Sequence, residues 1–419
     1  MNLSVSRVLL YAGRLHRSIW FAPTVYTLGS LLVLAAAPLF APVVPARAPS
    51  LFNADTLEQI LGILASSMLA VAIFSLGTMV SALQAAASAA TPRARVLLTE
   101  DRTAQNAIST FIGAFIYSIL AIIVVSTDYY DDRSTVILFA VTIGIVVIVI
   151  VTLISWIARL SRLGGVAEAV RMVERAANRT FSECSRTPCF GGKPLGSVSS
   201  GVCRIELGSM GTIQHVDWET LGELAESLDT EIHVLARPGA LADAGTAIAA
   251  SGRSLADEDV DAVRNCFVVG TERTFEEDPL FGVVVLSEIG QRALSPAVND
   301  PGTAIDVINT IVRVARHWRK CDHDGDGEVR FPRLFVPELD PAQFVIDGFR
   351  AIARDGAGNV EVATAVQKAL AMIRDLDPDA FADPAARMSR EVLDRCRAAM
   401  DSDDDVAMVE EIALQAAQD

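Results

Sequence analysis

Charge is missing from the most apolar parts of this 419-residue chain. Four long stretches, residues 19–44, 57–83, 107–126 and 135–157, have no Asp, Glu, Lys or Arg in their central turns. A hydrocarbon core of about 30 Å is crossed by roughly 20 apolar residues in a helix, so each stretch predicts a membrane-spanning helix. Proton relays and ion-coupled transporters usually keep ionisable side chains at depth, which argues against that class of protein. Four helices are also few for the two inverted halves of a typical secondary transporter.

Lysine is absent from residues 1–159, and acidic residues are scarce there. This part has 9 Arg and 7 acidic residues, a net charge of +2, whereas the remaining 26 basic and 44 acidic residues give −18. The positive mean hydropathy of +0.38 therefore comes from the first part and the acidity from the second. We expect a membrane domain followed by an acidic soluble domain. A domain of this charge repels phosphate, which disfavours nucleic acid as a partner.

Complete catalytic and metal-binding patterns are also missing. The six cysteines all follow residue 183, where thiols of a cytoplasmic domain stay reduced, and none forms a C-x-x-C pair. Cys184 and Cys189 are close in sequence, but no His lies nearby, so zinc is disfavoured. No nucleophile with a neighbouring base and no phosphate-binding loop is recognisable. We expect no cofactor, no metal and no enzymatic activity.

Arginine placement predicts how the helices cross the membrane. Cytoplasmic loops are enriched in Lys and Arg, and the two loops assigned to the opposite side hold only Arg47 and Arg133. Both termini are therefore expected in the cytoplasm, which in a bacterium makes this a multi-pass protein of the inner membrane with lipid as a constant partner. The arginines on the cytoplasmic side are Arg7, Arg14, Arg17, Arg93, Arg95, Arg102, Arg159, Arg162 and Arg171.

The second apolar stretch has two chemically different faces. At about 100° per residue, its small and polar side chains fall within a sector roughly 120° wide, in which Phe74 is the one bulky residue. The far side has larger apolar side chains, and we expect it to face lipid. The first face, called here the small-residue stripe, consists of Ser66, Ser67, Ala70, Phe74, Gly77, Thr78, Ser81 and Gln84, and the far side of Met68, Leu69, Ile73, Leu76, Met79, Val80 and Leu83.

Two interpretations of the small-residue stripe compete. Small residues let helices approach closely and hydroxyls add weak interhelical bonds, so packing between helices is the simpler one. Alternatively, copies of the helix surround a wet path, and Phe74 forms a hydrophobic constriction that gates by dewetting. Small residues in the third stretch, such as Gly113 and Ala114, make the stripe less distinctive.

The sequence predicts a membrane α-helical fold with four transmembrane helices, plus a cytoplasmic α/β and α-helical domain. An amphipathic pattern continues beyond the fourth helix and is interrupted at Gly164-Gly165, a candidate hinge. We expect a four-helix transmembrane domain at 1–159, an amphipathic stalk helix at 160–182, a linker at 183–199, a small α/β domain at 200–275, and a mainly helical domain at 276–419 with a short hairpin near 328–337.

Asp-Pro pairs recur in the last 150 residues and are typical of helix starts. Asp is a favoured N-cap and Pro a favoured first helical residue, and each cap is worth roughly 1 kcal/mol. "SPAVNDPGTAID", residues 295–306, therefore reads as a helix end followed by a new start, and no His stands ready as a base for Ser295. With the single Asp of "HVDWETLGEL", the expected N-caps are Asp217, Asp278, Asp300, Asp340 and Asp383.

Two further patterns fall short of a metal site. Asp322–Asp326, in "DHDGDG", match the start of a calcium loop, but the twelfth position, which should be Glu, is Arg333. A solvated turn is the simpler interpretation. His215 and His233 flank one expected helix without a third ligand, so structural roles are expected for both.

Two segments resemble a known bacterial family of predicted membrane proteins, domain of unknown function twenty-two fifty-four. One is "EEDPLFGVVVLSEIGQRALSPAVNDPGTAID", and the other is residues 67–117. The chain departs from the family in the alanine-rich "AAASAAT" before Pro92, where the family has more polar residues. The resemblance implies a membrane protein and no particular activity. Matching elements in residues 67–117 are Ser75, Gln84, Pro92-Arg93, Asp101-Arg102, Gln105, Phe111, Gly113, Phe115 and Tyr117.

We expect a homo-oligomer, because four small-faced helices enclose no path by themselves. The leading hypothesis is an oligomeric ion or solute channel with an acidic cytoplasmic regulatory domain. The alternative is a non-conducting scaffold or sensor whose cytoplasmic domain docks a protein partner.

Overall fold

Two units make up the part of the chain that the computed structural model describes. The described residues are 21–43, 54–89, 91–99, 102–127, 132–160, 165–196, 203–323 and 328–418. The membrane unit extends to Glu168, apart from the segment ending at Ala94. The C-terminal unit contains that segment and all described residues from Ala169 onward. Each unit is considered by itself.

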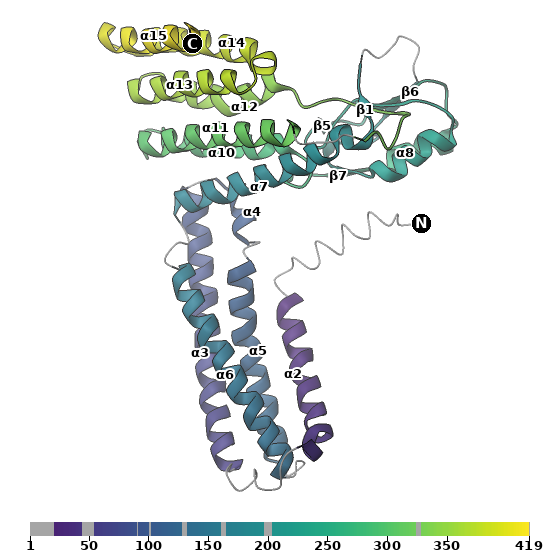
Figure 1. The fold of residues 1–419 in the computed structure, drawn as a ribbon, viewed down its shortest axis with the longest axis vertical. Helices are drawn as coiled ribbons and strands as arrows, with labels where there is room; N and C mark the ends of the chain where they lie inside the picture. Colours follow the sequence, from purple (N-terminus) through teal and green to yellow (C-terminus); the bar gives the residue numbers. More distant parts are fainter. Residues whose placement is uncertain are drawn as a thin grey trace. The chain divides into compact units, whose positions relative to one another are not determined.

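Long apolar helices build the membrane unit (Figure 1). Among the described residues, three helices are long and apolar enough to cross a membrane, over Asp55–Ala82, Ala104–Val125 and Arg133–Leu160. A further apolar segment, Thr24–Phe40, is shorter. Three of the four predicted spans therefore have a membrane-spanning length in the structure. The elements are α2 (Phe21–Phe40), η1 (Ala41–Val43), α3 (Ala54–Ala89), α4 (Ala94–Thr99), α5 (Arg102–Val125) and α6 (Asp132–Leu160).

α5 is the central helix of this unit and packs against α2, α3 and α6. Phe111 and Tyr117 of α5 are almost fully buried, each within its own cluster of apolar side chains. The Tyr117 hydroxyl lies 3.0 Å from the Thr142 hydroxyl of α6, which satisfies both groups inside the bundle. At Gly113, a Cβ atom would lie 2.8 Å from Cβ of Tyr26, so α2 approaches α5 closely because that residue is glycine.

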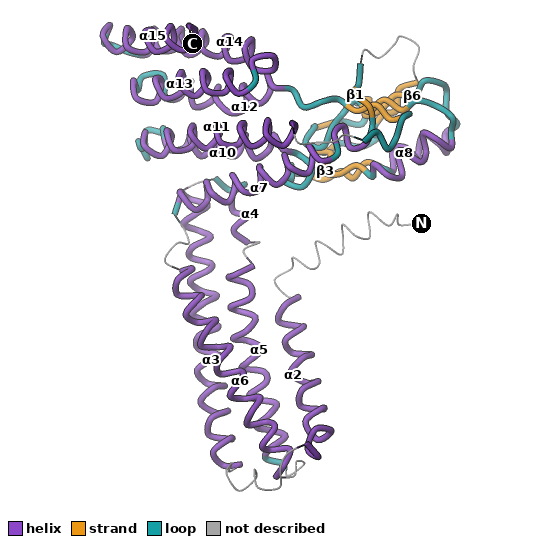
Figure 2. The backbone as a smooth tube through the Cα atoms, viewed as in Figure 1, coloured by secondary structure: helices purple, strands orange, loops and turns teal. Residues whose placement is uncertain are grey.

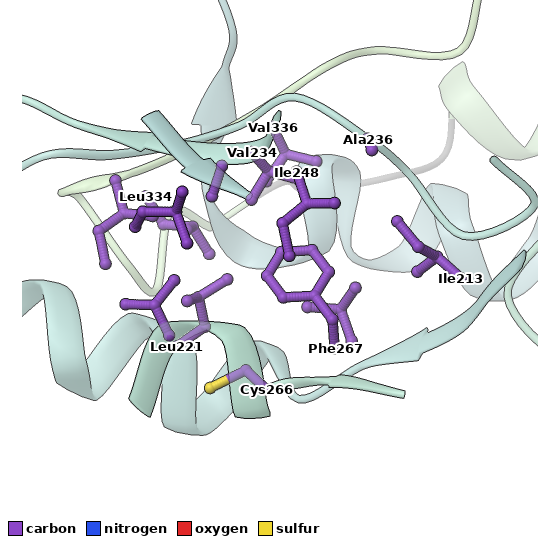
Figure 3. Close-up of a cluster of buried hydrophobic side chains, with 14 of the residues drawn as sticks. Ile213, Leu221, Val234, Ala236, Ile248, Cys266, Phe267, Leu334 and Val336 are labelled. Atoms are coloured by element: carbon purple, nitrogen blue, oxygen red, sulfur yellow. The ribbon is translucent and has the colours of Figure 1, made fainter. Parts of the chain in front are cut away.

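The strands of the C-terminal unit lie together with α8, apart from the helices α10 to α15 (Figure 2). A five-stranded sheet has the order β1-β8-β4-β6-β2, and a three-stranded sheet the order β5-β3-β7. Side chains from both sheets and from α8 meet in one apolar core that includes Ile213, Leu221 and Val234 (Figure 3). The elements are β1 (Lys193–Pro194), β2 (Cys203–Glu206), β3 (Gly211–Val216), α8 (Trp218–Ser227), β4 (Ile232–Val234), β5 (Leu241–Ala242), β6 (Ala247–Ser251), α9 (Asp257–Asn265), β7 (Phe267–Gly270) and β8 (Leu334–Val336).

The larger sheet draws strands from outside the segment 200–275 that was predicted to form it. β8 is a single strand that pairs in parallel with β4 and with β1, so the hairpin predicted near 328–337 is absent from the described residues. Residues 183–199, predicted as a linker, contain the end of α7, a 3-10 turn and β1. Both differences have one cause, because parallel partners far apart in the chain leave no local turn signal.

Six helices, α10 to α15, form a bundle against which α7 packs (Figure 1). Phe181 of α7 stacks on Trp318 of α11, with ring centroids 5.1 Å apart, and Phe344 of α12 lies 6.1 Å from Phe181. These buried rings fix α7 along the bundle. The helices are α7 (Val166–Arg186), α10 (Pro279–Ala293), α11 (Pro301–His323), α12 (Pro341–Asp355), α13 (Val360–Leu376), α14 (Pro378–Ala399) and α15 (Asp403–Gln418).

Aspartates stand at the starts of most of these helices. The carboxylates of Asp217, Asp278 and Asp340 each accept a backbone N–H from the first turn. Asp300 does the same before α11, where its Oδ1 accepts the N–H of Thr303 at 3.0 Å. The structure does not place Asp383 at a helix start.

Asp383 lies inside α14, and this prediction was wrong. The helix begins six residues earlier, where Asp377 caps it by accepting the N–H of Ala380 at 3.2 Å. Asp377 also pairs with Arg319 of α11. Pro384 lies inside α14, in its second turn, where it has no N–H to donate to the carbonyl of Ala380, so the second Asp-Pro pair begins no helix.

Asp377→Ala should therefore cost much more stability than Asp383→Ala. We expect a loss of about 1 kcal/mol or more for the first, since a cap is removed and Arg319 loses its partner. The second, at an exposed position, should stay within about 0.5 kcal/mol of the unchanged protein. Denaturant unfolding of the detergent-solubilised chain measures both. Equal losses would contradict this assignment of the helix start.

Candidate functional site

α3 buries an apolar stripe against its neighbours and leaves the small-residue stripe exposed. Met68 and Met79 lie on the buried side, in contact with the helices around α5. They were predicted to face lipid, and that prediction was wrong, because lipid and a packed interior accept the same apolar side chains. The buried residues recur every three or four positions: Leu57, Leu61, Leu64, Met68, Ala72, Ser75 and Met79.

The small-residue stripe points away from the chain's own helices. Phe74 is 66% exposed, and the half-buried members, Ser67 and Thr78, lie at the edge of the stripe. Ser75, which belongs to the family resemblance, lies on the opposite, buried face. The other members are all exposed: Ser66, Ala70, Gly77, Ser81 and Gln84.

Three of the four hydroxyl groups of the stripe are bonded within α3. Ser66 Oγ donates to the carbonyl of Gly62 at 3.0 Å, Ser67 Oγ to that of Ile63 at 2.7 Å, and Thr78 Oγ1 to that of Ser75 at 2.9 Å. These groups need neither water nor an acceptor on another helix, so their presence alone does not demand a wet path.

Two glycines leave the backbone of α3 uncovered by side chains on this side. Nothing lies within 4 Å of a Cβ atom built at Gly62 or at Gly77. With Ser66 and Ala70, Gly62 forms a series of small residues at four-residue spacing, the pattern that lets two membrane helices approach closely. The exposed face of α3 is therefore shaped for another helix.

A second group of polar side chains surrounds the Glu277-Asp278 pair of the C-terminal unit. Glu277 Oε1 lies 2.6 Å from Nδ1 of His215, and Oε2 accepts the indole N–H of Trp218 at 3.3 Å. Asp278 caps α10 and receives both Nε (2.7 Å) and Nη2 (3.0 Å) of Arg273. These five residues, called here the sheet–bundle joint, tie β3 and α8 to the start of α10.

In the sheet–bundle joint, burial and the neighbouring charge shift the pKa of a residue in opposite directions. Burial alone would lower the pKa of His215, but the hydrogen bond and charge of Glu277 outweigh it, so the pKa is raised. The pKa of Asp278 is raised because its burial outweighs the bond from Arg273. At Gly239, which has φ of +95°, a Cβ would lie 2.2 Å from Asp278 Oδ2, so only glycine fits beside this carboxylate.

A histidine, a serine and a cysteine also meet between α7 and α11. His317 Nε2 lies 2.7 Å from Ser182 Oγ and 3.5 Å from Cys321 Sγ. The same nitrogen lies 3.0 Å from the backbone carbonyl of Asn178, which can only accept, so this contact is a hydrogen bond in the tautomer protonated at Nε2. A protonated nitrogen cannot act as a base for either neighbour, and the group joins two helices instead.

The described residues contain no group of three or more His, Cys, Asp or Glu side chains that could hold a metal ion. His233 stacks on Phe335 of β8, with ring centroids 4.9 Å apart, and His215 belongs to the sheet–bundle joint. Residues 324–327 of the calcium-like stretch lie outside the described residues.

Sequence reasoning missed the partners of Glu277. The sequence "EEDP" belongs to the family resemblance and predicts the helix cap at Asp278. It does not predict the contacts with His215, Trp218 and Arg273, because these residues lie in other parts of the chain. The contact between His317 and Ser182 was missed for the same reason.

A family model described as "Predicted membrane protein (DUF2254)" matches residues 16–372. The chain therefore belongs to this family. Three mycobacterial proteins are each 34% identical to it over 111 residues: "Uncharacterized protein Mb1321c" of Mycobacterium bovis, and "Uncharacterized protein MT1328" and "Uncharacterized protein Rv1290c" of Mycobacterium tuberculosis. Each match covers 25% of this chain and 21% of the relative. No solved structure matches the chain significantly.

The raised pKa of His215 predicts a pH-dependent stability. A histidine whose pKa is higher in the folded state stabilises the fold below its unfolded pKa of about 6.5, and this contribution is lost as the pH rises through the folded value. Glu277→Gln should therefore cost roughly 1 to 3 kcal/mol at pH 6 and clearly less at pH 9.

Denaturant unfolding at the two pH values measures this difference. Glu272→Gln, the same change at an exposed position of the same segment, is the control and should leave the pH dependence intact. If Glu277→Gln and Glu272→Gln behave alike at both pH values, His215 and Glu277 are not coupled.

Proposed function

We propose that this membrane protein is a homo-oligomeric channel in which copies of α3 surround a shared conducting path. The observation that carries the proposal is the uncovered small-residue stripe of α3. A helix that keeps glycine and serine exposed, while Leu61, Met68 and Met79 pack inside its own bundle, has a face on which another copy can pack closely.

The path proposed along α3 has a hydrophobic constriction and polar ends. Phe74 is the bulky member of the stripe, and a ring of such side chains gates by excluding water. α3 has 36 residues and is about 54 Å long, so it exceeds the hydrocarbon core of about 30 Å. Asp55 and Glu58 at one end and Gln84 near the other are exposed.

The proposed topology has four membrane crossings, with α2 as the first. The described part of α2 is apolar throughout, and the arginines lie on the side assigned to the cytoplasm. Both termini and the C-terminal unit are then cytoplasmic, and in a bacterium the protein resides in the inner membrane.

An alternative function also involves a homo-oligomer but no conducting path. The hydroxyls of Ser66, Ser67 and Thr78 bond to their own helix, so the stripe can pack against copies without water. The protein would then be a non-conducting scaffold or sensor, whose C-terminal unit docks a cytoplasmic protein.

Disulfide crosslinking in membranes tests the oligomer. The native cysteines all follow residue 183, so the membrane helices offer a clean background. Ser81→Cys should give crosslinked dimers on mild oxidation, because the stripe of one copy faces that of the next. Leu76→Cys, also exposed but about 140° around the helix, should give none. Crosslinking of Leu76→Cys alone would place the contact on the wrong face.

Single-channel recording in planar bilayers tests conduction. Phe74→Ser removes the hydrophobic constriction and should raise open probability or conductance at least severalfold. Leu76→Ser, about 160° from Phe74, should resemble the unchanged protein. Silence from all three proteins, together with efficient crosslinking through Ser81→Cys, would favour the scaffold.

A further inference from the structure

The helices of the C-terminal bundle are arranged as three stacked hairpins (Figure 1). The hairpins are α10 with α11, α12 with α13, and α14 with α15. Their first helices pack in the order α10, α12, α14, and their second helices in the order α11, α13, α15. In such a stack each hairpin buries its apolar side chains against its neighbours. Each end of the stack therefore presents a surface that a further helix can cover.

α7 covers the first end of the stack. Phe181 of α7 stacks on Trp318 of α11, with ring centroids 5.1 Å apart. A Cβ atom at Gly282 of α10 would lie 3.1 Å from Cα of Ala177, so α7 and α10 are in close contact. Val173, Ala177 and Phe181 are all buried in this contact. The apolar side chains of the first hairpin are thus covered by a helix that precedes it in the chain.

α15 forms the second end of the stack, and one of its faces is exposed. Its inner face, with Val409 and Ala413, is buried where α15 packs against α13 and α14. On the outer side, Met408 is 51% and Leu414 is 63% exposed. The outer residues lie about 100° to 160° around the helix from Val409. We call them the end face, which consists of Asp404, Ala407, Met408, Glu411, Leu414 and Gln415, all exposed.

The end face combines apolar side chains with negative charge. α15 has five Asp and Glu residues and no Lys or Arg, whereas α14 has four residues of each sign. Glu410, outside the end face, pairs with Arg397 of α14. Within it, Glu411 accepts an amide N–H of Gln415 at 3.1 Å, a neutral donor that does not cancel its charge. The face therefore matches a helix that presents apolar and basic side chains together.

We propose that the end face binds a basic amphipathic helix of a protein partner, which continues the stack as its next helix. Met408 and Leu414 supply the apolar contacts of a helix-to-helix interface, and Asp404 and Glu411 attract the basic side chains. A second copy of the end face carries the same negative charge and is repelled, as is an anionic lipid surface. The inference is independent of the proposed channel, because it uses no residue of α3.

A designed peptide tests the proposal on the full-length protein in an uncharged detergent. The probe is a fluorescein-labelled peptide of Leu and Lys, placed so that its helix has one apolar and one basic face. Fluorescence anisotropy, with empty micelles as background, should show saturable binding. A matched peptide with Glu in place of Lys should bind at least about tenfold more weakly. Equal binding of both peptides, or no binding above background, would contradict the proposal.

Two matched double variants locate the bound peptide. Met408→Gln with Leu414→Gln should weaken binding of the Lys peptide by roughly tenfold or more, because both apolar contacts are lost. Met210→Gln with Leu241→Gln makes the same change beside the sheet, where these side chains are 76% and 68% exposed, and should stay within about twofold. Thermal unfolding checks that both variants fold. Equal losses in the two variants, or no loss in the first, would overturn the proposal.

Crosslinking and particle mass distinguish the other possible occupants of the end face. A Lys peptide with a photoreactive benzoylphenylalanine on its apolar face should crosslink to α15, as mapped by mass spectrometry. Crosslinks confined to the membrane helices would mean that the peptide binds elsewhere. A particle mass, measured by light scattering, that falls only in the variant Met408→Gln, Leu414→Gln would mean that a second copy covers the face. Either result contradicts the proposal.

Discussion

Hydrocarbon offers no hydrogen-bond partner, and this constraint governs the membrane unit. Each polar group at depth must be satisfied by the protein itself. The Tyr117 and Thr142 hydroxyls pair with each other between α5 and α6, and Ser66, Ser67 and Thr78 bond to carbonyls of their own helix. Since the hydroxyls of Ser66, Ser67 and Thr78 are bonded within α3, what distinguishes the exposed face of α3 is its shape. Shape complementarity is also the main force that joins helices in lipid.

In the C-terminal unit, hydrogen bonds from other residues likewise compensate the carboxylates of Glu277 and Asp278. Glu277 and Asp278 are adjacent in sequence but serve different elements, because one carboxylate bonds to His215 and Trp218 and the other to Arg273 and the first turn of α10. Removing either carboxylate leaves donors unpaired at the junction of the sheets and the bundle. A buried group without its partner costs more than a surface pair contributes. Glu277 and Asp278 of the family signature therefore join the sheets to the bundle.

Local signals made much of the fold predictable. Membrane spans follow from uninterrupted apolar length, and four helix starts from Asp followed by a helical pattern. Two failures show the limit. Asp377 and Asp383 carry the same Asp-Pro signal six residues apart, and only the pairing of Asp377 with Arg319, 58 residues away, distinguishes them. β8 has no turn signal because its partners, β1 and β4, are parallel and distant in sequence. The faces of α3 were partly misjudged for a different reason, since hydropathy cannot separate a lipid-facing methionine from a packed one.

α7 begins at the end of the membrane unit and continues in the C-terminal unit. Its first turn is bonded to the end of α6 through Glu168 and Arg159, and its later turns are fixed to the bundle by Phe181. The backbone hydrogen bonds within α7 resist bending. Since no glycine or proline lies between Val166 and Arg186, α7 has no obvious hinge. The buried residues Val173, Ala177 and Phe181 are therefore held on one face of a regular helix, and their packing against the bundle depends on that regularity.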